Sequence, residues 1–152
     1  MTPRWICLIA LAGLLAGCAQ QRTFQVAVRN ETTQPITVGF AKEEGGPFEP
    51  AWATPEEIAI GTPSYAERSW DSVQVPPGRT GVAGPIAGKF DGNARGFLRI
   101  YAATGKLEDL IAISRGSPHR ADVLLSPGRN AIVVRVENDR LVAERVQLPP
   151  AK

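Results

Sequence analysis

Residues 24–30 read Phe-Gln-Val-Ala-Val-Arg-Asn, and residues 36–40 read Ile-Thr-Val-Gly-Phe. Each stretch has an apolar side chain at every second position, which is the period of a β-strand with one face in a core and the other toward solvent. Residues 30–35 join the two stretches and are rich in amino acids that favour turns. The pattern therefore predicts two strands joined as an opening β-hairpin.

The strand pattern returns after residue 72 and continues almost to the C-terminus. Turns rich in Gly, Pro, Asn and Asp separate the stretches. The continuous apolar run Leu110 to Ile113 predicts a strand buried on both faces. About eight short strands of this kind are typical of a β-sandwich or small barrel, and we expect a single all-β sandwich over residues 23–152. The predicted strands after residue 72 contain Val73 and Val75, Val82 and Ile86, Phe97 to Ala102, Leu110 to Ile113, Ala121 to Leu125, Ile132 to Val136, and Leu141 to Leu148.

Two strand-turn-strand units have similar sequences. Residues 73–80 read Val-Gln-Val-Pro-Pro-Gly-Arg-Thr, and residues 123–130 read Val-Leu-Leu-Ser-Pro-Gly-Arg-Asn. These units resemble those of immunoglobulin-like sandwiches in bacterial surface proteins, although the Cys and core Trp of true immunoglobulin domains are missing. The resemblance implies an immunoglobulin-like β-sandwich and says nothing about activity.

Residues 43–71 interrupt the strands with a segment much longer than a usual hairpin loop of about 2 to 5 residues. Thr54 is placed to cap a helix, Pro55 suits the first helical position, and Glu57 can close a capping box. A glycine and a proline soon afterwards limit the length of this helix. We therefore expect a long insertion that carries one or two helical turns over residues 55–60.

The insertion is also acidic. Residues 43–71 hold seven Asp and Glu against one Arg, whereas residues 72–152 hold twelve Lys and Arg against seven Asp and Glu. An acidic segment is thus set into a basic body.

Four aromatic side chains of the insertion form the candidate contact surface: Phe48, Trp52, Tyr65 and Trp70. In one interpretation they pack over an end or a face of the sandwich and the acidic residues meet the basic body, because large aromatic residues in a small domain are mostly buried. In the other, one or two of them face outward as a platform for a protein or a glycan, where Trp and Tyr are favoured. Long ordered loops usually bind or cover something, so the insertion is the best candidate for function.

The chain begins with the three parts of an export signal: a basic start with Arg4, an apolar stretch over residues 5–15, and small residues before a cysteine. The stretch is shorter than the roughly 20 residues that a membrane-spanning helix needs. The sequence Leu15-Ala16-Gly17-Cys18 resembles the lipobox of bacterial lipoproteins. The resemblance implies that residues 1–17 are a signal peptide, that cleavage falls between Gly17 and Cys18, and that Cys18 carries the lipid.

Lipidation of Cys18 implies that the protein lies in the cell envelope, with the membrane as its first partner. More than one acyl chain is needed for durable anchoring, and the lipoprotein modification supplies it. Ala19 follows the cysteine, which resembles the pattern of Gram-negative lipoproteins that are forwarded to the outer membrane. Residues 18–22 are expected to form a short tether, whose full extension of roughly 15 Å keeps the domain close to the bilayer.

The sequence offers little for catalysis. His119 is the single histidine, so Ser-His or Cys-His catalysis would depend on it. The neighbouring Ser117-Pro118 is more typical of a turn between strands, and no Gly-x-Ser-x-Gly pattern is present. Removal of the signal and lipidation of Cys18 leave no free cysteine, and the sequence has neither a calcium-binding nor a phosphate-binding loop pattern. We therefore expect no metal and no cofactor.

These observations leave three hypotheses for function. The first is a non-enzymatic, membrane-anchored binding or assembly module of the envelope, which contacts a protein partner through the insertion. The second is a glycan-binding or peptidoglycan-binding module that uses the same aromatic residues. The third is a hydrolase that depends on His119. After residue 17 the chain has 16 Lys and Arg against 15 Asp and Glu, which leaves no strong field to attract nucleic acid.

Overall fold

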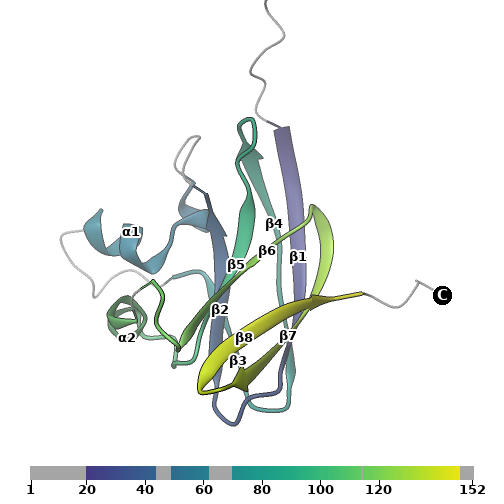
Figure 1. The fold of residues 1–152 in the computed structure, drawn as a ribbon. Coiled ribbons are helices and arrows are strands. Elements are labelled where there is room, and N and C mark those ends of the chain that lie inside the picture. Colours follow the sequence, from purple (N-terminus) through teal and green to yellow (C-terminus); the bar gives the residue numbers. More distant parts are fainter. Residues whose placement is uncertain (1–19, 44–48, 62–69, 114, 148–152) are drawn as a thin grey trace, which may run out of the picture.

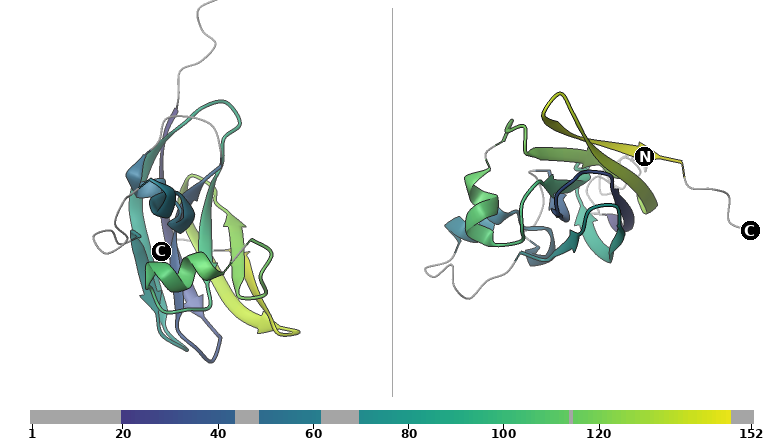
Figure 2. Two further views of the ribbon diagram at one scale, coloured as in Figure 1. Left: turned by 90° about the vertical axis from the view of Figure 1, so that its left-hand side faces the viewer. Right: turned by 90° about the horizontal axis from the view of Figure 1, so that it is seen from below.

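The computed structural model describes residues 20–43, 49–61, 70–113 and 115–147, and within them the strands form two four-stranded sheets packed face to face (Figure 1, Figure 2). Sheet A has the order β4-β1-β7-β8, with β4 Thr80–Phe90, β1 Gln20–Asn30, β7 Gly128–Glu137 and β8 Arg140–Val146. Sheet B has the order β3-β2-β5-β6, with β3 Ser72–Val75, β2 Ile36–Lys42, β5 Gly96–Tyr101 and β6 Arg120–Leu124. The helical elements are η1 Pro50–Trp52, α1 Pro55–Ile60 and α2 Leu107–Ala112.

This architecture confirms the predicted all-β sandwich with a helix in its insertion. Its likeness to immunoglobulin domains lies in the two packed sheets. Its strand order differs from the ABED and CFG sheets of immunoglobulin constant domains, because the first strand shares a sheet with the fourth, seventh and eighth. Within sheet A, β1 pairs antiparallel with β4 and parallel with β7.

The main core lies between the two sheets and follows from the alternation along each strand. In β1 the side chains of Phe24, Val26 and Val28 are buried, and those between them are more exposed. Leu98 and Ile100 of β5 meet them from sheet B. Alternate side chains of a strand point to opposite faces of its sheet, so this pattern sets which face of each strand is internal.

The predicted hairpin of β1 with β2 is wrong, because these strands belong to different sheets. The chain crosses from sheet A to sheet B after Asn30, whose side chain is fully buried. Its amide Nδ2 donates to the carbonyl oxygens of Gln34 at 2.9 Å and Val75 at 2.8 Å, and its Oδ1 accepts from the backbone N–H of Thr32 at 2.9 Å. This side chain therefore satisfies the backbone groups of a connection that runs between sheets instead of within one.

The two similar strand-turn-strand units also cross between the sheets. The first connects β3 of sheet B with β4 of sheet A, and the second connects β6 of sheet B with β7 of sheet A. Their Pro and Gly residues are thus used for sheet-switching turns, which a sequence pattern does not distinguish from hairpin turns.

The predicted strand at Leu110 to Ile113 is also wrong, because residues 107–112 form α2. Leu107 and Leu110 are buried and Ile111 packs partly against the same cluster, which is the i, i+3, i+4 spacing of a helix face. Glu108 and Asp109 stand in its first turn, where the positive end of the helix dipole favours acidic residues.

Helix α1 has the bounds expected from sequence, and its capping box is complete. The Oγ1 of Thr54 accepts from the backbone N–H of Glu57 at 3.2 Å, and the backbone N–H of Thr54 donates to the Glu57 carboxylate at 2.7 Å. Strand β1 begins at Gln20, so residues 20–22, which the sequence assigned to the tether, are part of sheet A.

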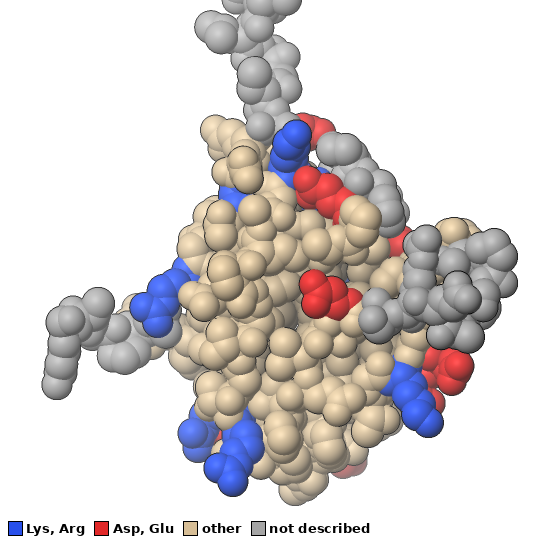
Figure 3. All heavy atoms as spheres, turned by 180° about the vertical axis from the view of Figure 1, so that it is seen from behind, with Lys and Arg blue, Asp and Glu red and all other residues tan. Residues whose placement is uncertain are grey.

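The open side of the sandwich, where β3 and β4 form the edges of the two sheets, is largely uncharged (Figure 3). Residues 72–88 contain a single charged residue, Arg79. The register of β1 with β4 shifts between Phe24 and Val26, opposite Gly84 and Pro85. A bulge and a proline both discourage a free strand edge from pairing with a strand of another chain. They therefore protect β4 against such pairing, although β4 has few charged side chains.

We predict that Asn30→Ala lowers the free energy of unfolding by about 2–3 kcal/mol, because it removes three hydrogen bonds that a fully buried side chain makes to the backbone. Denaturant unfolding followed by circular dichroism measures this loss. The matched control is Thr33→Ala, an exposed change in the same connection, which should leave the midpoint nearly unchanged. Equal midpoints for the two variants would contradict the role given to Asn30.

Candidate functional site

Helices α1 and α2 lie over the outer face of sheet B (Figure 2), and Trp70 packs on the same face; we call these three parts the cap. Strand β2 is therefore buried on both faces: Ile36, Val38 and Phe40 face the main core, while Thr37 and Gly39 lie under the cap. The hydroxyl of Thr37 donates to the carbonyl oxygen of Ala103 at 2.7 Å, which ties β2 to the segment that leads into α2.

Trp70 lies directly on β2 at Gly39. A Cβ at position 39 would be 2.4 Å from Cζ2 of the indole, so a side chain larger than glycine has no space there. The indole meets the ring of Tyr101 edge to face, with centroids 5.5 Å apart. Trp70 and Tyr101 form a second apolar cluster with Leu107 and Leu110 of α2. This cluster holds the cap on the sheet.

Trp52 belongs to the main core instead. Its indole lies 5.1 Å from the ring of Phe90 and 5.3 Å from that of Phe24, in both cases edge to face. Its Nε1 donates to the carbonyl oxygen of Ala87 at 3.0 Å. The insertion thus closes one end of the sandwich with Trp52.

Two of the four aromatic residues proposed as a contact surface are not available for contact. Trp52 is 2% exposed and Trp70 is 5% exposed, so an outward platform of these two residues is wrong. Phe48 and Tyr65 lie outside the described residues. Both Trp side chains pack over the sandwich, as the first interpretation of the insertion expected.

Four charged side chains form an ion-pair cluster between α1 and sheet B. The register places Arg99 of β5 beside Asp122 of β6, and Tyr101 beside Arg120. The Nε of Arg99 donates to Asp122 at 2.9 Å, and Nη2 of Arg120 donates to the same carboxylate at 3.2 Å. Glu56 of α1 joins both guanidinium groups, at 2.9 Å from Arg120 and 3.3 Å from Arg99. Two cations and two carboxylates leave the cluster neutral.

Two further acidic residues of the insertion also meet basic residues of the body. Glu43 accepts two hydrogen bonds from Arg95, at 3.0 and 3.1 Å. Glu49 lies 3.7 Å from Nζ of Lys42 and accepts from the backbone N–H of Lys89. These contacts confirm the interpretation in which the acidic insertion meets the basic body.

The ion-pair cluster changes the acid-base properties of its neighbours. Burial raises the pKa of Tyr101 to about 12, and the negative charge of Glu56 acts in the same direction. Burial also raises the pKa of Asp122, but the hydrogen bond and charge of Arg99, with a contribution from Arg120, outweigh it and hold that pKa below its usual value. Asp122 is therefore a carboxylate at neutral pH and Tyr101 is a neutral phenol.

Two hydrogen-bond donors under the cap have no partner among the described residues. They are Nε1 of Trp70 and the hydroxyl of Tyr101, and both atoms are buried. An unpaired buried donor destabilises a structure by about 1–3 kcal/mol. Among the described residues, the layer between the cap and sheet B is therefore held by apolar contact and by the ion-pair cluster.

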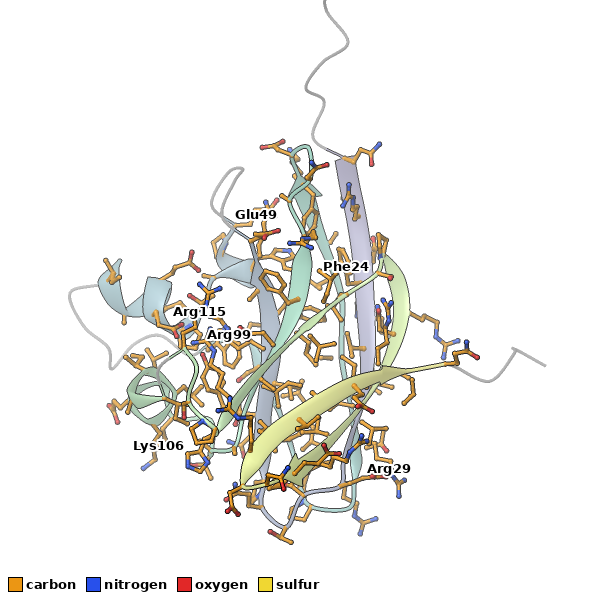
Figure 4. The ribbon with its side chains drawn as sticks, viewed as in Figure 1. Phe24, Arg29, Glu49, Arg99, Lys106 and Arg115 are labelled. Atoms are coloured by element: carbon orange, nitrogen blue, oxygen red, sulfur yellow. The ribbon has the colours of Figure 1, made fainter. Side chains whose placement is uncertain are left out.

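A cleft of about 870 Å³ opens beside the ion-pair cluster, between α1, the segment after α2, and the outer face of sheet B. Phe97 and Ile111 supply apolar surface, and the other lining residues are polar or charged. Arg115 lies at the mouth near Arg99 (Figure 4). Its exposed side chain makes no ion pair with another described residue, whereas Arg99 is fully engaged. The cleft can thus offer a free guanidinium next to apolar surface.

His119 lies in a turn between α2 and β6, as its sequence context predicted. The side chain is exposed, and the Oγ of Ser117 accepts from the backbone N–H of His119 instead of from its imidazole. Asp122, the nearest acid in sequence, is held by Arg99 and Arg120. These residues are not arranged as a catalytic triad.

The described residues contain no group of three or more His, Cys, Asp or Glu that could hold a metal ion. No helix within them is long and apolar enough to cross a membrane. No family model, curated protein or solved structure matches the chain. The site is therefore interpreted from its own geometry.

Sequence reasoning missed Arg99, Arg120 and Asp122. A weak signal was present, since each stands at an outward position of its strand, where a charged residue is ordinary. What the sequence does not show is the register that places them side by side, or the helix that brings Glu56 above them.

We predict that Glu56→Gln loosens the cap, because the amide cannot replace the charge that joins both arginines to α1. Hydrogen exchange of the amides of α1 should become faster than in the wild type. The loss in free energy of unfolding should be about 0.5–1 kcal/mol, since about a third of the Glu56 side chain is exposed. The control is Glu108→Gln, on the exposed side of α2. Unchanged exchange in α1 would show that the cluster does not hold the cap.

We also predict a specific pH dependence for Asp122→Asn. The pKa of Asp122 is lower in the folded protein than in the unfolded chain, so its contribution to stability is present above the unfolded value of about 3.9 and is lost as the pH falls through the folded value. The difference in unfolding free energy between wild type and variant should be constant from about pH 7 to 5 and should shrink below about pH 4. Urea titrations at each pH test this, with Asp139→Asn, an exposed change in the turn between β7 and β8, as the control. A difference that grows on acidification would contradict it.

Proposed function

We propose that this protein is a lipid-anchored protein of the bacterial cell envelope, whose sandwich is a non-enzymatic binding or assembly module. The contact surface is the cleft between the cap and sheet B, with Arg115 and the apolar side chains of Phe97 and Ile111 as its recognition groups. The partner is another envelope protein that presents an acidic side chain next to an apolar one. In a host with two membranes, the outer membrane is the proposed location.

The cleft is the observation that carries this proposal. The ion-pair cluster forms its floor. Arg99, Arg120 and Glu56 are paired with one another there, so a ligand does not need to break these ion pairs to bind. Arg115 is free to pair with a carboxylate, and an Arg-carboxylate contact beside apolar surface is a frequent arrangement in protein interfaces. A partner of this chemistry fits the cleft, because the cleft is open to solvent and its surface is about equally polar and apolar.

The anchoring half of the proposal rests on the lipobox resemblance of residues 15–18. Strand β1 begins two residues after Cys18, so a lipid on Cys18 would be joined to the domain by a very short linker. A domain attached in this way works close to a membrane surface.

The two alternatives receive less support. Glycan binding through stacked aromatic rings needs exposed rings, and both described Trp side chains of the insertion are buried. Hydrolysis through His119 needs a nucleophile and an orienting acid near the imidazole, and its neighbours Ser117 and Asp122 have other partners. We therefore propose neither.

Site-specific photo-crosslinking in cells tests the proposed surface. A benzophenone amino acid is placed at Phe97 or Ile111, which line the cleft, and at Val82 as a control on the opposite sheet, where the side chain is 54% exposed. We expect one discrete protein adduct from the two cleft positions and none from Val82. Arg115→Glu, combined with the cleft label, should reduce the adduct because the new charge repels an acidic partner.

The same experiment separates the anchor from the surface. Cys18→Ser should release the protein from the membrane fraction or leave it uncleaved, whatever the cleft does. Adducts of equal yield from Val82, or none from either cleft position, would contradict the cleft assignment and leave the anchor untouched.

A further inference from the structure

The end of the sandwich at which β1 begins, which we call the anchor pole, contains the first residues of β1 and the turn from β4 to β5. Gln20 pairs with Phe90, so the turn of residues 91–95 lies at the end of the sandwich where β1 begins (Figure 1). This turn is therefore the loop nearest in space to the first residue of β1.

Covalent geometry fixes how far the anchor pole can be from a lipid on Cys18. Two residues span at most about 7 Å and four span at most about 14 Å, so these are the limits for Gln20 and Arg22. The headgroup layer on each side of a bilayer is roughly 5–8 Å thick. A lipid on Cys18 would thus hold the anchor pole at the headgroups, because only Ala19 separates Cys18 from the start of β1.

The anchor pole has a hollow of about 780 Å³, lined by Arg22, Glu43 and residues 92–95. The guanidinium of Arg22 lies over the ring of Phe90, 5.5 Å from its centroid, which orients it at the hollow. Its one hydrogen bond to a described residue is long, at 3.4 Å from Nη1 to the carbonyl oxygen of Ala94. Most of its donors therefore remain available.

The carboxylates at the anchor pole do not neutralise Arg22. Glu43 is held by Arg95, and Glu49 lies beside Lys42. The exposed Lys89, opposite Gln21, also makes no ion pair through its side chain with a described residue. One exposed carboxylate, Asp91, opposes them among the described residues of the anchor pole. Arg22 lines the hollow, and Lys89 lies on the other face of the paired strands β1 and β4, so the anchor pole presents an unpaired cation on each of its two sides.

We propose that the anchor pole binds the phosphate groups of phospholipid headgroups, with Arg22 and Lys89 as the binding residues. The inference rests on the proposed lipid anchor and adds a second attachment to the same bilayer. A guanidinium pairs with two phosphate oxygens at once, and an ammonium binds phosphate as a point charge. The lipid on Cys18 sets the distance of the domain from the bilayer, and the two cations set its tilt.

Fluorescence quenching in vesicles measures this tilt. The full chain is expressed with its signal, purified in lipidated form and reconstituted into vesicles of phosphatidylethanolamine and phosphatidylglycerol at about three to one. Cysteines occur only at positions 7 and 18 of the sequence, so Asn93→Cys provides one new thiol for a dye at the anchor pole, and Thr33→Cys provides one at the opposite end. A spin-labelled headgroup lipid should quench the dye at residue 93 strongly and the dye at residue 33 weakly.

Charge variants then test the two binding residues. Removal of either cation, as Arg22→Gln or Lys89→Gln, should lower the ratio of docked to undocked protein by roughly fivefold. Arg22→Lys, which keeps the charge, should retain more docking than Arg22→Gln. The matched control is Arg79→Gln, an exposed change of the same charge at the opposite end, and it should leave the quenching unchanged. Lys89→Gln also guards against a folding defect, since its side chain is exposed.

The outcomes separate this inference from the proposed function. If the wild-type protein does not float with the vesicles, the lipid anchor fails and the proposed function fails with it. If it floats but the dyes at residues 93 and 33 are quenched equally, or if the Arg22 and Lys89 variants behave like Arg79→Gln, the headgroup contact alone is overturned.

Discussion

The contact of Trp70 with Gly39 is the constraint on which the candidate site depends. Because residue 39 has no side chain, the indole lies against the backbone of β2, and a Cβ there would be 2.4 Å from the ring. This close approach lets the cap pack directly on sheet B and buries β2 on both faces. Without it, the outer face of sheet B would be an ordinary solvent-exposed face, since one-sided burial is the usual state of an antiparallel sheet.

Burial under the cap in turn dictates how the neighbouring charges are arranged. Arg99 and Asp122 lie in the same row of sheet B as Gly39, and Arg120 lies in the next row with Tyr101. A charge that is removed from water is strongly destabilising unless it is paired, so the covered arginines need carboxylates from β6 and α1. Arg115 is beyond the covered area and can remain unpaired. The boundary of the cap thus separates structural charges from charges available to a partner.

The sequence predicted the features that depend on a local pattern. It did not predict the features that depend on contacts between segments far apart in the chain. The capping box of Thr54 and Glu57 is a contact within four residues, so α1 was predicted with its bounds. The alternation of Phe24, Val26 and Val28 was enough for a strand. The same pattern does not say whether the next strand joins the same sheet, because that depends on Asn30 reaching Val75, 45 residues away. Leu110 to Ile113 was ambiguous because a short apolar run fits a strand or a helix face equally well.

The anchor pole and the cleft are distinct surfaces, yet they share a wall. Glu43 and Arg95 line both the hollow at the anchor pole and the cleft beside the ion-pair cluster. Both side chains are well exposed, so their pairing is a surface ion pair of modest strength. A phosphate at the hollow and a carboxylate in the cleft would each attract Arg95. Either ligand would compete with Glu43, the ion-pair partner of Arg95 among the described residues. In the proposed membrane-bound state, the position of this one guanidinium would link the orientation of the domain to the charge of the cleft.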